Sequence, residues 1–568
     1  MELSAGPGGP VGARRRQPAP CWVRVFRPRS VAGPRASGDA GPVRQLSYAA
    51  TEPGALRPRR RRTTVPGSSP GCRTELGTAS SSAGPERSSA LRYAQAVDDR
   101  QREERSTVTD LSQIVKAYDV RGVVPHQWDE QVAEALGAAF AQVLNTGGEP
   151  GDAVLIAHDM RDSGPRLAAA FATGVRGAGR GVIELGLAST DMLYYASGSL
   201  DLPGAMFTAS HNPAEYNGIK MCRAGARPIG QDSGLAEIRA RAQALLDEGA
   251  AQPLGAASAP VQQRDLLADY AAYLRKLVDL TRIRPLKVVV DAGNGMGGYT
   301  VPTVLGDAAL AALPLEIVPL YFELDGTFPN HEANPLDPKN LVDLQRAVRA
   351  GGADIGLAFD GDADRCFVVD ERGEPVSPSA ITALVAAREL AKHPGSTVIH
   401  NLITSAAVPE IIRENGGQPV RSRVGHSFIK AEMARTNAIF GGEHSAHYYF
   451  RDFWFADTGM LAAMHTLAAL GEQSLPLSVL AGEYERYVAS GEINSTVEDQ
   501  AARVAEVRAA YPDAEVDETD GLTLRFADRA WFNLRASNTE PLLRLNVEAP
   551  IRERMASLRD AVLDRVRR

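Results

Sequence analysis

ADIGLAFDGDADR, residues 353–365, decides the fold class of this 568-residue chain, because it joins a strand pattern to a cluster of carboxylates. Apolar runs followed within a few residues by Gly, Asp or Asn recur at 153–159, 287–295 and 396–402, and helical patterns such as SAITALVAARELAK (379–392) come between them. Strands that alternate with helices of this length predict α/β units with largely buried sheets. Ligands of such sheets bind beyond the carboxyl ends of the strands, so the residues after these runs are the candidate site residues.

The C-terminal stretch has a different pattern. The segments LTLRF (522–526), WFNLRAS (531–537) and LLRLNVEA (542–549) predict antiparallel strands, and ERMASLRDAVLDRV (553–566) predicts a closing helix. We therefore expect an α+β unit at the C-terminus. The Ala/Gly/Pro-rich AQPLGAASAP (251–260) indicates a linker between two of the earlier units.

The first hundred residues differ from the rest in composition. They hold 17 Arg, no Lys and seven Asp or Glu, and they show neither helical nor strand periodicity. This composition predicts a disordered leader over 1–107 without a catalytic role. Aromatic side chains that could stack on bases are nearly absent, and no apolar segment follows the arginines as in a secretory signal. An organelle-targeting peptide and a wrongly assigned start are the alternatives.

The remainder of the chain has the composition expected of a soluble globular protein. It carries a net charge of −17 once the +10 of the leader is set aside, which argues against nucleic acid as a partner. No window of 18 apolar residues predicts a membrane span. The four Cys form no CxxC pair, which indicates a reducing compartment, and we expect a cytoplasmic monomer or homodimer.

The acidic loop DGDADR (360–365) places Asp360, Asp362 and Asp364 at alternate positions. Two like charges about 4 Å apart repel by about 4 kcal/mol at an effective dielectric of about 20, so a converging trio needs a cation. Ligand sets made only of oxygen suit Mg²⁺ or Ca²⁺. The loop is not an EF-hand, because Arg365 occupies the sixth position, where that loop requires Gly. A solvated acidic turn is the alternative.

Three further loops carry polar side chains. The serine loop TASHNPAEYNG (208–218) sets Ser210 beside His211 after an apolar run, where a helix N-cap or a simple turn is the alternative. The arginine loop RASNTEP (535–541) offers hydroxyls, backbone N–H groups and a guanidinium that could cradle a phosphate. The histidine loop GGEHSAH (441–447) offers groups that could hold sugar hydroxyls.

These four loops occur in the same order in a known family, and the chain resembles the phosphohexomutases of the phosphomannomutase/phosphoglucomutase superfamily. Other matching stretches are KAYDVRG (116–122), GLASTDMLYYA (186–196), YNGIK (216–220), DGTFPNHEANP (325–335) and RVGHSFIK (423–430). The resemblance implies three related α/β domains and a smaller C-terminal α+β domain around a central cleft. The expected domains are 108–258, 259–370, 371–480 and 481–568, which carry the serine, acidic, histidine and arginine loops in turn.

The resemblance also implies site residues and their roles. Ser210 would carry a phosphate and complete the ligand set of Mg²⁺ on the three aspartates, and a hexose 1,6-bisphosphate would form and turn over in the cleft. His211 and Lys220 are both candidates for proton transfer, and Arg121 belongs to the same catalytic group. The alternative for His211 is a turn hydrogen bond, and the alternative for Lys220 is a solvated strand end. The implied substrate-binding residues are Tyr118, Arg365, His426, Glu443, Ser445, His447, Arg535, Ser537, Asn538, Thr539 and Arg544.

The implied function is the interconversion of hexose 6-phosphate and hexose 1-phosphate. Asn538 stands where many phosphoglucomutases have Gly, and TAS (208–210) stands where phosphoglucosamine mutases commonly have SAS, so both details favour phosphomannomutase. Phosphoglucomutase or dual specificity is the first alternative, and phosphoglucosamine mutase is a weaker one. A non-catalytic relative is not favoured, since neither the serine nor a metal carboxylate is missing. One departure is Asp191, at a usual proline of the family, which puts the local loop shape in doubt.

Overall fold

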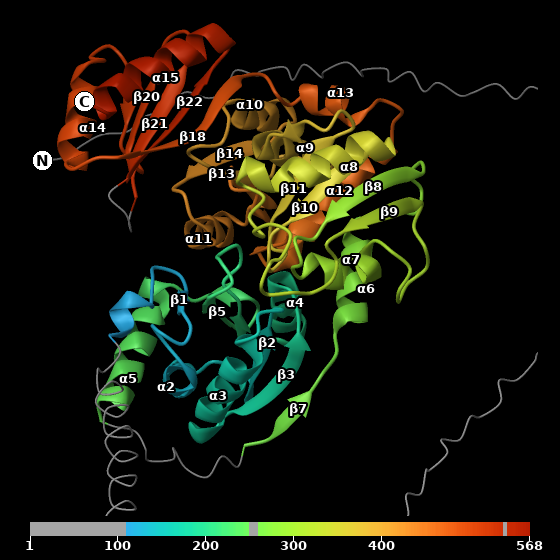
Figure 1. Cartoon of the computed structure of the whole chain (residues 1–568), viewed down its shortest axis with the longest axis vertical. Helices are drawn as coiled ribbons and strands as arrows, with labels where there is room; N and C mark the ends of the chain where they lie inside the picture. Colours follow the sequence, from blue (N-terminus) through green and yellow to red (C-terminus); the bar gives the residue numbers. More distant parts are fainter. Residues whose placement is uncertain (1–109, 249–258, 538–541) are drawn as a thin grey trace, which may run out of the picture. The chain divides into compact units, whose positions relative to one another are not determined.

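The computed structural model describes residues 110–248, 259–537 and 542–568, and in this part of the chain four β-sheets follow one another along the sequence (Figure 1). The expected leader and most of the predicted linker lie outside the described residues. The first three sheets contain parallel strands and are accompanied by helices, whereas every strand pair of the fourth is antiparallel. The predicted α/β class with an α+β unit at the C-terminus is therefore confirmed.

The first sheet has the strand order β1-β5-β4-β2-β3-β7, with β6 paired to β5. Its strands are β1 (Val120–Val123), β2 (Ala153–His158), β3 (Gly181–Leu187), β4 (Gly204–Phe207), β5 (Tyr216–Arg223), β6 (Arg227–Pro228) and β7 (Val261–Gln263). The accompanying helices are η1 (Leu111–Gln113), α2 (Glu130–Thr146), α3 (Gly164–Gly177), α4 (Thr190–Leu200), η2 (Gln231–Ser233) and α5 (Leu235–Asp247). Strand β4 is buried at every position, as its uninterrupted apolar sequence predicts, and the serine loop follows its carboxyl end.

The second sheet has the order β12-β11-β10-β8-β9. Its strands are β8 (Leu286–Asp291), β9 (Leu315–Leu320), β10 (Ile355–Phe359), β11 (Cys366–Asp370) and β12 (Pro375–Val376). The helices are α6 (Leu267–Leu277), α7 (Gly297–Val304), η3 (Pro338–Leu341) and α8 (Val342–Gly351). Strands β10 and β11 are buried along their whole length and form an antiparallel pair, so the acidic loop is the connection of a buried hairpin.

The third sheet has the order β14-β13-β15-β16-β17. Its strands are β13 (Thr397–Asn401), β14 (Gln418–Ser422), β15 (Phe440–Gly442), β16 (Tyr448–Phe450) and β17 (Ala456–Asp457). The helices are α9 (Pro378–Lys392), α10 (Ala407–Glu414), α11 (His426–Thr436), η4 (Arg451–Phe453), α12 (Gly459–Gly471) and α13 (Leu477–Gly482). The histidine loop connects β15 to β16, which pair antiparallel.

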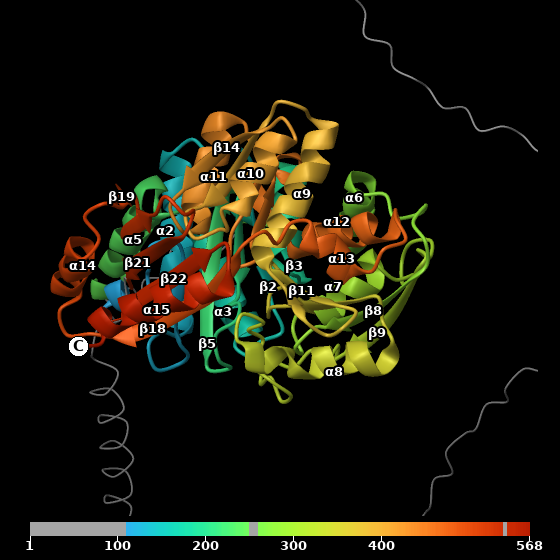
Figure 2. The same cartoon turned by 90° about the horizontal axis from the view of Figure 1, so that it is seen from above.

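The fourth sheet has the order β18-β22-β21-β20-β19. Its strands are β18 (Val488–Thr496), β19 (Glu515–Asp517), β20 (Leu522–Arg525), β21 (Trp531–Ala536) and β22 (Leu542–Ala549). Helices α14 (Gln500–Ala509) and α15 (Arg552–Val566) pack on this sheet (Figures 1 and 2). The arginine loop begins at the end of β21, and its Asn538 and Thr539 lie outside the described residues.

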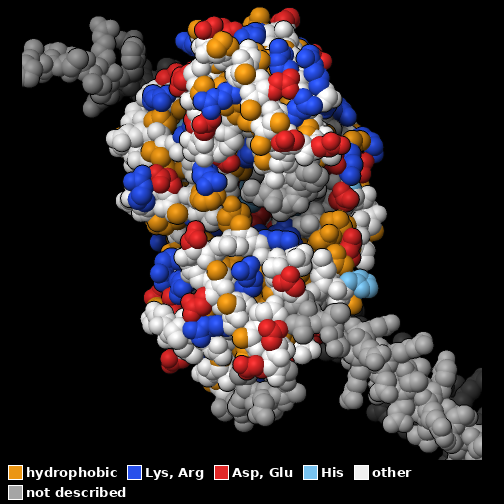
Figure 3. Space-filling view, turned by 90° about the vertical axis from the view of Figure 1, so that its left-hand side faces the viewer, with side chains coloured by type: hydrophobic (Ala, Val, Ile, Leu, Met, Phe, Trp, Pro, Cys, Tyr) orange, Lys and Arg blue, Asp and Glu red, His pale blue; other side chains and the backbone are white. Residues whose placement is uncertain are grey.

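In the described part of the chain, the fourth sheet does not share a hydrophobic core with the other three. One continuous core contains Leu155 of β2, Val290 of β8 and Val398 of β13, whereas the fourth sheet buries its own core around Phe532 and Leu558. Among the described residues, no helix has the length and apolarity needed to cross a bilayer. On the face seen in Figure 3, Lys and Arg side chains are interspersed with Asp and Glu.

Candidate active site

The serine loop and the acidic loop meet, although they are far apart in the sequence. Ser210 Oγ donates a hydrogen bond to Asp360 Oδ2 at 2.7 Å, and Arg365 Nη2 lies 3.2 Å from the same hydroxyl. Ser210 is 4% exposed and has a backbone φ of 49°, in the left-handed region that residues other than Gly rarely adopt. The serine hydroxyl is therefore fixed and directed at a carboxylate.

The acidic loop brings three carboxylates together in the protein interior. Asp360, Asp362 and Asp364 are each at most 1% exposed, and each offers an oxygen within 4.8 Å of the others. The Oδ1 atoms of Asp362 and Asp364 are buried without a hydrogen-bond partner. Buried carboxylate oxygens without donors are what a hard cation requires, so this cluster could hold a metal ion.

Lys220 on β5 and Arg365 balance the charge of the cluster. Lys220 Nζ pairs with Asp362 Oδ2 at 2.6 Å and with Asp364 Oδ2 at 2.5 Å. Arg365 pairs with Asp360 at 2.8 Å. Burial disfavours the charged ammonium, but the two carboxylates outweigh it and raise the pKa of Lys220 well above its usual value. Lys220 is therefore held as a cation.

The three carboxyl groups have different proton affinities. Burial raises the pKa of Asp360 to about 7, with a further contribution from the neighbouring aspartates, although Arg365 opposes the shift. Burial also acts on Asp362, but Lys220 outweighs it and holds the pKa of Asp362 below its usual range. Thr190 at the start of α4 donates a further hydrogen bond to Asp362 Oδ2 at 2.5 Å. The cluster thus combines one proton-accepting carboxyl group with ionised ones.

His211 lies against the serine hydroxyl. Its Nδ1 is 3.2 Å from Ser210 Oγ and also accepts a hydrogen bond from Arg365 Nη2. The charge of Arg365, together with burial, holds the pKa of His211 well below its usual value, so the imidazole is neutral. Arg121 lies on the other side of the loop, where its Nη1 donates to Asn212 Oδ1 at 2.6 Å and its Nη2 pairs with Asp119 at 2.6 Å.

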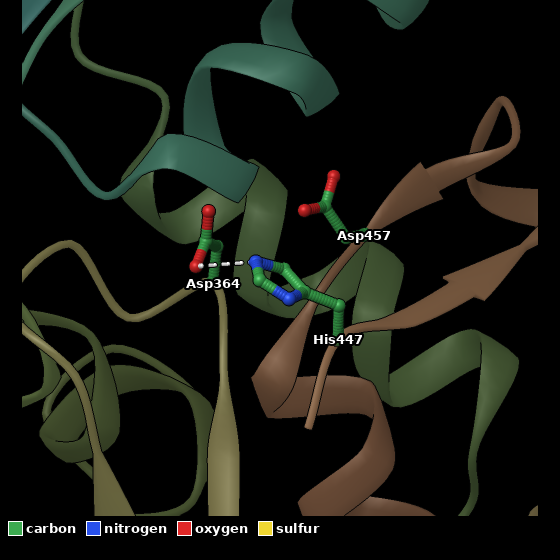
Figure 4. Close-up of side chains that lie close together, drawn as sticks. All are labelled: Asp364, His447 and Asp457. Carbon is green, nitrogen blue, oxygen red and sulfur yellow. Dashed lines mark ion pairs between the residues drawn. The ribbon is translucent and has the colours of Figure 1, made fainter. Parts of the chain in front are cut away.

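A second polar cluster contains His447, Asp364 and Asp457 (Figure 4). His447 Nε2 lies 3.7 Å from Asp364 Oδ1, and Asp457 Oδ1 pairs with Lys430 Nζ at 2.6 Å. Burial would raise the pKa of Asp457, but Lys430 and nearby histidines hold it below its usual range. This cluster shares Asp364 with the acidic loop and contains two carboxylates and one imidazole, whereas the acidic loop offers three carboxylates, the ligand type that Mg²⁺ prefers.

The carboxylate of Glu443 in the histidine loop is buried and accepts several hydrogen bonds. Glu443 is 2% exposed and accepts hydrogen bonds from Asn401 Nδ2 (3.1 Å), Gly425 N (3.2 Å) and Tyr449 Oη (2.5 Å). An ionised carboxylate has about four acceptor positions, so one remains for a ligand. Ser445 Oγ lies 3.1 Å from His447 Nδ1.

Tyr118 and His426 meet across the first and third sheets. Their rings form an edge contact with centroids 5.1 Å apart. Burial and the nearby Lys430 lower the pKa of His426 to about 4, so this imidazole is neutral. The two residues come from KAYDVRG and RVGHSFIK, and their contact brings these two matching stretches together.

The arginine loop has a different environment. Arg535 Nη2 lies 3.4 Å from Glu492 Oε2, and Arg544 Nη1 lies 3.2 Å from Glu492 Oε1. Ser537 continues the sheet through a backbone hydrogen bond to Leu542 O at 2.8 Å. The structure therefore brings the two arginines together around one acid of β18.

Four family profiles match the chain in succession. Residues 112–247, 268–373 and 377–487 match the phosphoglucomutase/phosphomannomutase alpha/beta/alpha domains I, II and III, and residues 492–565 match the C-terminal domain of the same proteins. The chain belongs to the phosphoglucomutase/phosphomannomutase family. As a member of this family it is a phosphohexomutase, an isomerase that acts on hexose phosphates.

Comparisons with individual proteins give the same family. The chain is 42% identical to the phosphohexose mutases of Xanthomonas campestris pv. campestris over 441 residues, which is 76% of this chain and 94% of the relative. It is 40% identical over 443 residues, with the same coverage, to a phosphomannomutase of Salmonella typhimurium. Among solved structures, a phosphoglucomutase/phosphomannomutase family protein from Burkholderia thailandensis matches with a TM-score of 0.71 and 33% identity, over 80% of this chain and 96% of that chain.

Several polar residues of the candidate site were not predicted from the sequence. Thr190 bonds the predicted Asp362, Asp457 lies close to the predicted Asp364 and His447, and Lys430 pairs with Asp457; none of the three was predicted. Thr190 and Lys430 lie within matching stretches, GLASTDMLYYA and RVGHSFIK, so their position was a usable signal. Asp457 lies in neither. The departure at Asp191 has a structural account, because this residue sits in the first turn of α4 and accepts hydrogen bonds from Tyr270 Oη and Thr458 Oγ1, both at 2.7 Å.

Proposed function

We propose that this phosphohexomutase is a phosphomannomutase, which interconverts mannose 6-phosphate and mannose 1-phosphate through a phosphoserine at Ser210 and a hexose 1,6-bisphosphate. The observation that carries the proposal is the 2.7 Å contact of Ser210 Oγ with the buried carboxylate cluster. The names of the Salmonella and Escherichia coli relatives, both phosphomannomutases, support the choice of mannose. Phosphoglucomutase or dual activity is the alternative.

Asp360, Asp362 and Asp364 would hold Mg²⁺ together with the phosphate on Ser210. A Mg²⁺ ion there would neutralise charge on the transferred phosphoryl group. Two cationic side chains would neutralise charge at the same site, because Arg365 contacts Ser210 Oγ and Lys220 pairs with two of the aspartates. Phosphoryl transfer depends mainly on positioning and on charge neutralisation, and both are supplied by buried, fixed groups.

The proton must leave the attacking sugar hydroxyl, and Ser210 Oγ must receive one when it is the leaving group. His211 is the neutral base nearest to Ser210 among the described residues, and it can take up or return this proton. Lys220 is held protonated, so we assign it charge neutralisation rather than base catalysis. Arg121 would orient the serine loop through Asn212.

The sugar must bind in two orientations, because each of its two phosphates reacts in turn with Ser210. The remaining acceptor position of Glu443 and the hydroxyl of Ser445 would bind O3 and O4, which lie near the sugar's pseudo-symmetry axis and replace one another when the bisphosphate turns over. His426, His447 and Tyr118 would line the same side, and Arg535, Ser537, Asn538, Thr539 and Arg544 would hold the phosphate that is not reacting. We further propose the domain boundaries given above, a cytoplasmic location and a monomer or homodimer.

The test is an assay of the purified chain with Mg²⁺ and a hexose 1,6-bisphosphate. Mannose 1-phosphate, glucose 1-phosphate and glucosamine 6-phosphate are compared as substrates. We expect the highest kcat/KM with mannose 1-phosphate and a value for glucose 1-phosphate lower by about 10–200-fold, since the two sugars differ only at C2. A preference for glucosamine 6-phosphate would overturn the sugar assignment, and stoichiometric release of inorganic phosphate would overturn the mutase reaction.

A further inference from the structure

Arg161, three residues after β2, lies beneath the serine loop and is 1% exposed. Its guanidinium donates four hydrogen bonds to backbone carbonyls of that loop. Nη1 bonds to Pro213 O (2.7 Å) and Tyr216 O (2.9 Å), and Nη2 bonds to Ser210 O (2.9 Å) and Asn212 O (2.7 Å). One side chain thus binds the loop at four points around the reactive serine.

Arg161 also forms an ion pair through Nε and contacts an aromatic ring with the face of its guanidinium. Arg161 Nε lies 3.3 Å from Asp159 Oδ2, and the Phe328 ring, from the connection between β9 and η3, lies 5.1 Å from its Cζ. Of the five N–H donors of the guanidinium, the four on Nη1 and Nη2 bind carbonyl oxygens, whereas Nε is ion-paired with the carboxylate without forming a hydrogen bond to it. This arrangement fixes the plane of Arg161 in one orientation.

The loop has few bonds of its own that could replace Arg161. Within 209–216, the backbone bonds are Asn212 N to Ala209 O (3.0 Å) and Tyr216 N to Pro213 O (3.1 Å). Ser210 has a left-handed conformation that a free loop would not favour, and four converging carbonyl dipoles repel one another without a cation between them. Arg121 Nη1 and Thr208 Oγ1 add one side-chain bond each, at Asn212 Oδ1 and Ser210 N, so the four carbonyl bonds of Arg161 are a large part of what holds the loop in its shape.

The same carbonyl of Ser210 is the contact point of the acidic loop. A Cβ atom at Gly361 would lie 2.4 Å from Ser210 O, so Gly361 allows the acidic loop to pack directly on this atom. Arg161 Nη2 bonds to this carbonyl, and Gly361 packs on the same atom. The position of Ser210 relative to the three aspartates thus depends on an atom that Arg161 holds.

We propose that Arg161 is a positioning residue for phosphoryl transfer, which holds Ser210 Oγ in register with the carboxylate cluster. This proposal rests on the proposed role of Ser210 as the phosphate carrier. Lysine cannot replace Arg161, because an ammonium has three donors on a flexible stem and cannot bind four carbonyls in one plane.

The test compares Arg161→Lys with Arg180→Lys. Arg180 is a matched control: it is 6% exposed and donates to Asn145 Oδ1, Gly151 O and Glu149 O at 2.7–3.0 Å, at a turn that carries no proposed site residue. Both variants are measured for kcat, KM, melting temperature and hydrogen–deuterium exchange of the peptide covering 208–218.

For Arg161→Lys we expect kcat to fall by about 100-fold or more with KM within about threefold, since a 1 Å misplacement of a reacting group costs about this much. Exchange in 208–218 should rise by about tenfold or more, while α2 and α3 stay protected. Arg180→Lys should lower the melting temperature without either effect. A folded Arg161→Lys variant with unchanged exchange in 208–218 overturns the proposal, as does one that retains kcat within threefold.

The exchange measurement separates this proposal from the proposed function. If Ser210 is not the phosphate carrier, exchange in 208–218 still rises in Arg161→Lys, whereas Ser210→Ala leaves kcat unchanged. If Arg161→Lys does not fold, Asp159→Asn takes its place, because it removes the charge that orients Arg161 Nε and keeps the side-chain shape. That variant should show the same two changes at a smaller size, and the absence of both would overturn the proposal.

Discussion

The junction of the serine and acidic loops differs sharply from the surroundings of Arg535 and Arg544. At the junction, Ser210 and the three aspartates are at most 4% exposed and are joined by direct bonds. On the fourth sheet, the side chains of Arg535 and Arg544 are 12% and 32% exposed, and both face Glu492, whose side chain is 26% exposed. The first region is fixed and buried, and the second is partly exposed to solvent.

This difference corresponds to two requirements of a mutase. The atoms that exchange a phosphoryl group work best among fixed dipoles from which water is excluded. The groups that hold the other end of the substrate must release a phosphate and bind it again in a second orientation. Ion pairs that solvent reaches are weaker than buried ones, so the partly exposed region suits the phosphate-binding role proposed for it.

Ser210→Ala should have the largest effect, because it removes the proposed phosphate carrier from the centre of the buried region. We expect kcat to fall by at least about 10⁴-fold, since binding alone cannot replace a lost nucleophile. Intact mass should show one phosphate on the wild-type protein and none on the variant. Ser197→Ala, which also removes a buried serine hydroxyl, should remain active. Full activity of Ser210→Ala would contradict the mechanism.

Asp362→Asn should reduce activity more than stability. The variant keeps the side-chain shape, and Lys220 retains its partner Asp364, so we expect kcat to fall by about 10³-fold or more while the melting temperature changes by less than about 4 °C. Chelation should abolish turnover of the wild type and Mg²⁺ should restore it. Asp354→Asn, outside the site, is the control. A variant that melts early but keeps its rate would refute the assignment.

The affinity for Mg²⁺ should depend on pH through Asp360. Its pKa is raised to about 7 by burial, so protons compete with the cation below that pH. One proton changes affinity by up to tenfold per pH unit, and we expect a rise of up to about 100-fold from pH 5 to pH 7. Without metal, the stability that the protonated group contributes should be lost as pH rises from about 4 to about 7. Titration calorimetry at several pH values measures the first effect.

Glu443→Gln probes the boundary between the two regions. It replaces one acceptor oxygen by an amide, so it weakens the proposed sugar contact and one of the bonds to Asn401, Gly425 or Tyr449. Charge-assisted hydrogen bonds contribute about 1.5–3 kcal/mol, so kcat/KM should fall by about 10–100-fold. The fall should be similar for mannose 1-phosphate and glucose 1-phosphate. Loss with only one sugar would show that Glu443 does not serve a shared hydroxyl.

Glu492→Gln should have the smallest effect and the opposite sign. The substrate phosphate must compete with Glu492 for Arg535 and Arg544, and an exposed ion pair is worth at most about 1 kcal/mol. We expect KM for the hexose phosphate to fall by about two- to fivefold at low salt with kcat unchanged, and the difference to vanish at high salt. An increase in KM would mean that Glu492 orients the arginines instead of competing with phosphate.

The sequence by itself determined the class of the fold and the positions of the serine and acidic loops. Uninterrupted apolar runs such as GAMF (204–207) and IGLAF (355–359) form buried strands, and the residues just after them lie at the carboxyl ends. The run of alternate aspartates is informative because three like charges in one turn have few stable roles other than cation binding. These patterns are formed by residues that are neighbours in the sequence, so they can be recognised from the sequence alone.

Only the tertiary structure decided which groups surround these loops. Lys220 pairs with aspartates more than 140 residues away, Lys430 pairs with Asp457, and Arg161 binds carbonyls about 50 residues further on. Lysine and arginine are common surface residues, so their type does not reveal a buried partner. Backbone carbonyls leave no trace in the sequence at all, because every residue has one. The packing of separate sheets brings these groups together, and no local pattern encodes that packing.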